Sequence, residues 1–67
     1  MYNYRVVSTD IADHCTIDSE HFILARAIAA AKKAQRQHDD RGNQIGVTVE
    51  SRAENGSWWQ EGRAQDY

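Results

Sequence analysis

A long amphipathic segment from Asp18 to Asp40 constrains the fold more than any other part of this chain. Its interior is rich in alanine, which loses no side-chain entropy when a helix forms. Asp18 is placed to cap the first turn by accepting backbone hydrogen bonds, and Ile17 with Phe22 would close a hydrophobic staple around it. Gly42 follows as a left-handed stop. The segment is therefore predicted to be one helix.

The predicted helix has an apolar face and a basic face. The apolar stripe is made mostly of small side chains, so we expect the helix to lie flat and close on a sheet. It contains Ile23, Leu24, Ala27, Ile28, Ala31 and Ala34. The other side gathers Arg26, Lys32, Lys33, Arg36 and Gln37. A solvated surface is the ordinary use of such a basic stripe, and phosphate binding is the functional alternative.

Three further segments have the composition and alternation of β-strands, namely Tyr2–Thr9, Ile45–Arg52 and Ser57–Arg63. Residues 14–17 either form a short additional strand or lead into the helix, and the sequence leaves both open. Residues 64–67 have no pattern and are expected to fray. These elements predict an α+β fold in which one long helix packs on a three- to four-stranded, mostly antiparallel sheet.

Asn55-Gly56 predicts a two-residue type I′ turn, because this dipeptide tolerates positive φ at both positions. That turn would place Glu50 opposite Glu61, an unfavourable pairing of like charges. Three explanations remain open at this point. The true register differs from the one predicted here, a neighbouring arginine neutralises the two glutamates, or this face of the sheet is built for a partner.

The same register assigns opposite roles to the two adjacent tryptophans. Trp58 would pack under the helix, and Trp59 would lie on the open face beside Arg52, where the guanidinium stacks on the indole. Neighbouring residues of a strand point to opposite faces, so only one of the two tryptophans belongs to the core.

Size and composition predict a single domain covering residues 1–67, with a small core, since so short a chain buries only about 60% of its unfolded surface. Ten acidic and eight basic side chains leave a net charge of −2, which excludes a generally basic nucleic-acid binder. No secretory signal and no apolar run of membrane-spanning length are present. A cytoplasmic, reducing location is therefore expected.

No catalytic or metal-binding pattern stands out. The single cysteine, Cys15, cannot form an internal disulfide and is expected to be a buried or half-buried small apolar residue. Its histidine neighbour, His14, would point to the other face of a strand. Glu50 with Glu61 is the only other conceivable catalytic pair. Neither pair has a third orienting group, so we predict that the protein is not an enzyme and needs no cofactor or metal.

The order of a strand-rich N-terminus, an alanine-rich helix and a hairpin containing N-G-x-W resembles small phage-encoded anti-CRISPR proteins. The matching stretches are LARAIAAAKKAQ, from Leu24 to Gln35, and GVTVESRAENGSWW, from Gly46 to Trp59. They are similar to a type I-F inhibitor family of comparable length. The resemblance implies an inhibitor that binds a subunit of a type I CRISPR-Cas surveillance complex and blocks target DNA engagement in the cytoplasm of an infected bacterial host.

The residues themselves favour binding to a protein, with the chain acting as a monomer or a homodimer. A carboxylate array imitates DNA phosphates and attracts the lysines and arginines of a DNA channel. The candidate partner-binding residues are Glu50, Arg52, Glu54, Trp59 and Glu61 from the hairpin, with Asp10 and Asp13. Asp18 and Glu20 extend the acidic stretch.

The alternative function is a small nucleic-acid-binding module. The basic helix face would contact phosphates, and Trp59 with Tyr2 or Tyr4 would offer aromatic stacking.

Overall fold

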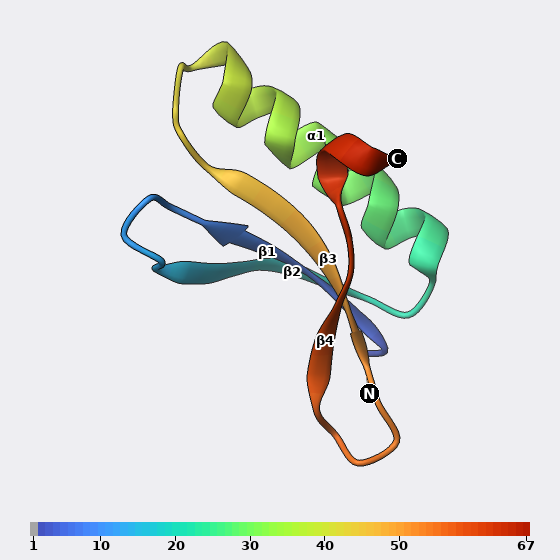
Figure 1. Ribbon diagram of the computed structural model, residues 1–67. Coiled ribbons are helices and arrows are strands. Elements are labelled where there is room, and N and C mark those ends of the chain that lie inside the picture. The colour runs from blue at the N-terminus through green and yellow to red at the C-terminus, as the bar shows by residue number, and fades with distance from the viewer. Residues whose placement is uncertain (1) are drawn as a thin grey trace.

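The computed structural model describes residues 2–67 as one helix packed on a four-stranded antiparallel sheet (Figure 1). The elements follow the order β1 (Tyr4–Thr9), β2 (Cys15–His21), α1 (Leu24–Asp40), β3 (Gly46–Arg52), β4 (Trp58–Arg63) and the short 3-10 turn η1 (Ala64–Asp66). The strands are arranged as β2-β1-β3-β4, with every neighbouring pair antiparallel. The α+β architecture predicted from the sequence is confirmed.

The start of the helix differs from the prediction, because α1 begins at Leu24 instead of Asp18. Residues 18–21 continue β2, which pairs with β1 along its full length. The Asp18 carboxylate accepts a hydrogen bond from the Ser8 hydroxyl across this pair, so it is engaged in the sheet instead of capping a helix. Ile23 occupies the N-cap in an extended conformation without a side-chain cap. Strand pairing thus overrides the local capping signal.

The end of the helix follows the prediction. Gly42 adopts a left-handed φ of 73°. Its amide donates to the Asp39 carbonyl at 3.1 Å, and the Asn43 amide donates to the His38 carbonyl at 2.9 Å. These two bonds form a Schellman motif, which satisfies carbonyls that the helix would otherwise leave unpaired.

The core lies between α1 and the two central strands. Ala27 and Ala31 are fully buried and pack against Val6, Val47 and Val49. The predicted stripe is confirmed at these alanines, while Leu24, Ile28 and Ala34 are partly buried around them and Ile23 is exposed. Small side chains on both sides bring the helix axis close to the sheet.

Ala31→Leu should lower the free energy of unfolding by about 1–3 kcal/mol, because added methylenes in a close-packed interface force neighbouring groups apart. Ala29→Leu, on the exposed side of the same helix, provides the control and should change stability little. Urea denaturation of both variants measures the difference. Equal midpoints would show that the helix does not lie close to the sheet at Ala31.

The β3–β4 turn also differs from the prediction. The Gly56 amide donates to the Ala53 carbonyl at 2.9 Å, and the Ala53 amide donates to the Ser57 carbonyl at 2.8 Å. Gly56 has a φ of 88°, but Asn55 does not have a positive φ. This pattern is a type I turn followed by a left-handed glycine, the usual three-residue hairpin loop. The predicted type I′ turn is therefore wrong.

The longer loop changes the register of the hairpin. Glu50 lies opposite Gln60, and an irregularity between Val49 and Glu50 leaves Glu61 as the extra residue of a β-bulge. The predicted opposition of Glu50 and Glu61 is wrong, and the register was the source of the apparent charge conflict.

Gly56→Ala should destabilise the protein by about 1 kcal/mol, because a Cβ disfavours the left-handed conformation while nothing crowds the site. Gly46→Ala is the matched control, since an added Cβ there also meets open space and the residue has no left-handed φ. It should leave stability nearly unchanged. If chemical denaturation ranks the two variants equally, the left-handed turn geometry is refuted.

Residues 64–67 were expected to fray, but the structure differs from this prediction. Ala64–Asp66 form the turn η1, which packs against the core. Ala64, at the start of η1, is buried and belongs to the same apolar cluster as Ala31 and Val47. Tyr67 then lies against Gly62 of β4, where an added Cβ would sit 2.5 Å from the phenol oxygen. Burial of one small side chain thus anchors a segment that has no periodic pattern.

Candidate protein-binding surface

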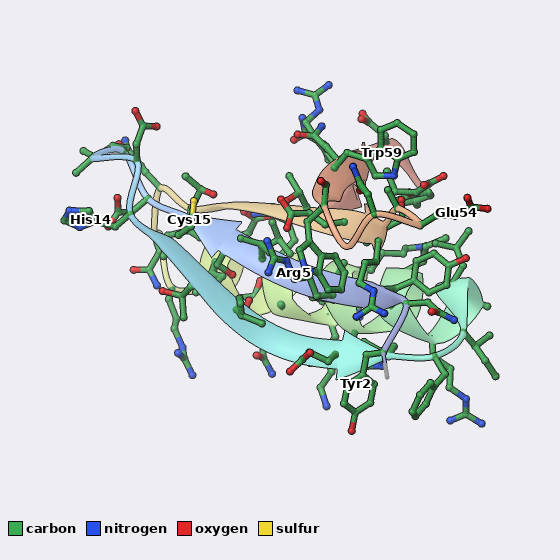
Figure 2. All side chains as sticks on the ribbon, turned by 90° about the horizontal axis from the view of Figure 1, so that it is seen from below. Tyr2, Arg5, His14, Cys15, Glu54 and Trp59 are labelled. Carbon is green, nitrogen blue, oxygen red and sulfur yellow. The ribbon has the colours of Figure 1, made fainter. Side chains whose placement is uncertain are left out.

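The face of the sheet opposite α1 carries a closed side-chain network. Arg5 Nε donates to Glu50 Oε1 at 2.5 Å, and the Arg5 guanidinium carbon lies 4.4 Å from the centre of the Trp58 ring. The Arg5 and Glu50 side chains are only 23% and 22% exposed. Figure 2 shows Arg5 in the middle of the sheet. These groups satisfy one another, so the network stabilises the fold and leaves little free for a partner.

The two tryptophans occupy the faces opposite to those predicted. Trp58 pairs with Arg52 and contacts Arg5 on the open face, so its predicted position under the helix is wrong. Trp59 pairs with Ser51 and lies on the helix side of β4, yet 65% of it is exposed. The β3–β4 hairpin extends away from α1, which leaves that side of its outer half uncovered (Figure 1).

Four exposed residues of β4 and of the segment after it are aromatic or acidic, and we call them the β4 surface: Trp59, Glu61, Asp66 and Tyr67. Trp59 and Gly62 occupy successive positions on the helix side of β4, and Tyr67 covers Gly62. The pKa of the Tyr67 phenol is raised, first by burial and then by the negative charges of Glu61 and Asp66. Both carboxylates therefore lie near this aromatic end of the surface.

The remaining predicted residues do not join this surface. Arg52 is half-buried on the open face, and Glu54 is exposed in the β3–β4 turn. Asp10 and Asp13 belong to the β1–β2 loop, at the far end of the molecule. In Figure 2, that loop, marked by His14, lies opposite Glu54 and Trp59. The structure thus separates the predicted set into four places: the open face of the sheet, the β3–β4 turn, the β1–β2 loop and the β4 surface.

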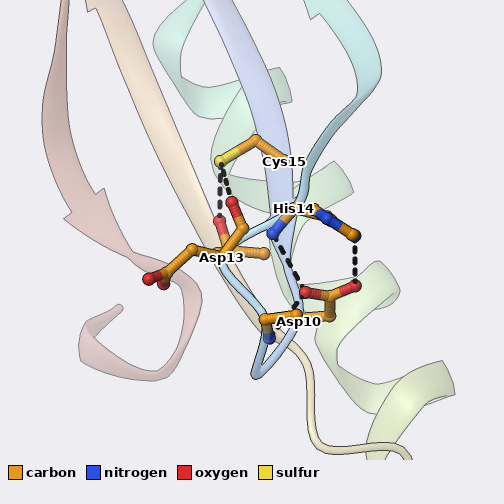
Figure 3. A network of polar contacts seen from close by, with 6 residues as sticks. Asp10, Asp13, His14 and Cys15 are labelled. Atoms are coloured by element: carbon orange, nitrogen blue, oxygen red, sulfur yellow. Dashed lines mark hydrogen bonds and ion pairs between the residues drawn. The ribbon is translucent and has the colours of Figure 1, made fainter.

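The β1–β2 loop uses its acidic residues to form the turn (Figure 3). The Asp10 carboxylate accepts hydrogen bonds from the amides of Ala12 at 2.9 Å and His14 at 3.0 Å. The His14 ring also lies 3.6 Å from Asp10 Oδ2. Asp13 adopts a left-handed φ of 63°. Asp10 therefore has a local structural role in this turn.

Cys15 is exposed, so the prediction of a buried or half-buried residue is wrong. Its Sγ lies 3.4 Å from Thr9 Oγ1 and 3.9 Å from the Asp13 carbonyl, while the adjacent His14 ring faces Asp10. This arrangement has no base placed to activate the thiol. Within residues 2–67, no three histidine, cysteine or carboxylate side chains converge on a common metal position.

No protein-family model, curated protein or solved structure matches this chain. In the part of the chain that the structure describes, no helix combines the length and apolar character required to cross a bilayer. The functional argument therefore depends on the chemistry of the chain's own surfaces.

Sequence reasoning identified Trp59 and Glu61 as binding candidates but missed Tyr67 and Asp66. The sequence feature that could have indicated this position is Ala64, a small apolar residue directly after a predicted strand. Burial of Ala64 against the core fixes the position of the residues that follow it. Without periodicity, that signal does not indicate where the final aromatic ring lies.

Glu50→Gln should lower the free energy of unfolding by about 1 kcal/mol, because it removes the carboxylate that neutralises a partly buried arginine. Glu54→Gln, at the exposed turn, removes the same charge without breaking an ion pair and should have no measurable effect. Denaturant unfolding at low and high salt compares the two variants. Equal stability would refute a stabilising Arg5–Glu50 pair.

Proposed function

We propose that this protein is a small protein-binding module whose β4 surface docks on a basic patch of its partner. The observation that carries this proposal is the exposure of Trp59, of which 65% remains accessible. An indole in water contributes little to folding, whereas tryptophan is among the residues that most often dominate binding energy. Trp59 is therefore the anchor of the interface.

The charge around the anchor determines the kind of partner. Glu61 and Asp66 place carboxylates near Tyr67, and Asp66 is also held by Arg63, whose Nε lies 3.1 Å from its Oδ2. A partner carrying lysine and arginine side chains around an apolar cleft complements this arrangement. Complementary charge of this kind accelerates encounter and disfavours wrong partners more than it adds affinity.

The resemblance to anti-CRISPR proteins names the partner to test, a subunit of a type I CRISPR-Cas surveillance complex. A surface that holds target DNA must present cations to phosphates. Carboxylates of the β4 surface would compete for those cations, and Trp59 would add an apolar contact that DNA phosphates do not provide. Inhibition would then result from occupation of the DNA-binding position without any reaction.

Trp59→Ala and Glu61→Lys should each weaken capture of a type I surveillance complex by about tenfold or more, since both alter the proposed interface. Phe22→Ala is the matched control, because Phe22 is also an exposed aromatic side chain but follows β2 at the other edge of the sheet. Circular dichroism verifies folding, and binding and phage-protection assays are then compared.

Loss of binding and protection in the two β4 variants, with Phe22→Ala unaffected, would support the surface and the partner together. Wild-type binding by both β4 variants would refute the surface. Failure of the wild-type protein to bind any type I complex would refute that partner.

A further inference from the structure

The positive charge of this acidic protein is concentrated on α1. Four of the eight basic side chains and none of the ten acidic ones lie between Leu24 and His38. This stretch therefore carries a formal charge of +4, and the whole of α1, which ends with Asp39 and Asp40, carries +2. Its cations are Arg26, Lys32, Lys33 and Arg36. A positively charged surface complements an anionic partner, whereas the β4 surface was proposed to bind a basic one.

Three of these cations border a hollow on the flank of the helix, which we call the α1 groove. It is a shallow depression that opens widely to solvent and lies along α1 alone, lined by Ala25, Ile28, Ala29, Lys32, Lys33 and Arg36. Ala25 and Ala29 end at Cβ, so a ligand approaches the helix backbone there. The longer side chains of Lys32, Lys33 and Arg36 lie beside these two alanines.

The cations are not neutralised within the protein. None of the four forms an ion pair with a carboxylate among residues 2–67, although Arg5 and Arg63 do. Lys32 and Arg36 stand one helical turn apart, and like charges at that spacing repel and destabilise a helix. An external anion would relieve this repulsion.

We propose that the α1 groove binds the phosphate backbone of nucleic acid without reading its sequence. Arg26 and Arg36 are separated by about 15 Å along the helix, a length over which one duplex strand presents about four phosphates. A helix about 10–12 Å across also fits a major groove about 12 Å wide. A flexible acidic polypeptide lacks this regular spacing of charge. The proposal does not rest on the β4 interface, although Tyr67 of the β4 surface lies beside Lys32 and Arg36.

Titration of a fluorescent DNA duplex of arbitrary sequence tests the groove. With four phosphate contacts, the logarithm of the binding constant should fall with the logarithm of salt concentration at a slope of about −3 to −4. The triple variant Lys32→Gln/Lys33→Gln/Arg36→Gln should reduce the slope to about −1 and weaken binding at least tenfold at low salt. A second duplex of different sequence should bind equally well.

The single variants Lys33→Gln and Arg41→Gln form the matched control, because both positions are exposed and only Lys33 lines the groove. Lys32 and Arg36 also border a hollow beside Tyr67, so Lys33 reports on the groove most directly. A larger loss of DNA binding for Lys33→Gln supports the proposal. Equal effects of the two substitutions, or salt-independent binding, would overturn it. Tighter binding of poly-glutamate than of DNA would overturn it in favour of an acidic protein partner.

Discussion

Close packing of Ala27 and Ala31 against the valines of β1 and β3 is the contact on which the rest of the structure depends. The largest fully buried side chains are valines, so the layer between helix and sheet is thin. Removing apolar surface from water is the main favourable term in folding, and this core offers few large groups for it. The opposite face contributes a second set of contacts, in which Val7 is buried and Arg5 lies over Trp58.

The β3–β4 hairpin shows how a small change in a turn relocates exposed side chains of a candidate binding surface. Gly56 takes the left-handed position alone, and the loop gains one residue over the expected turn. Side chains alternate along a strand, so a one-residue change in pairing exchanges its faces. Trp58 therefore packs under Arg5, while Trp59 remains exposed beyond the helix.

The two proposed surfaces carry side chains of opposite charge. The β4 surface combines aromatic rings with carboxylates, whereas the α1 groove combines a small apolar floor with unpaired cations. If both proposals hold, a protein with a net charge of −2 contacts a basic protein patch with one surface and a polyanion with the other. Trp59 lies on β4 and the groove residues lie on α1, regular elements that hold side chains more rigidly than loops do, whereas Asp66 and Tyr67 lie in and after the short turn η1.

The sequence by itself determined the fold class, the buried alanines of the helix stripe and the Gly42 stop. Each follows from periodicity or from the conformational freedom of one residue. Only the tertiary structure decided where β2 ends, how the hairpin pairs, and where Tyr67 lies. Asp18 has the local signal of a helix cap, but its carboxylate meets Ser8 across the sheet. These features depend on pairing between segments distant in sequence, and local patterns do not encode the energy of that pairing.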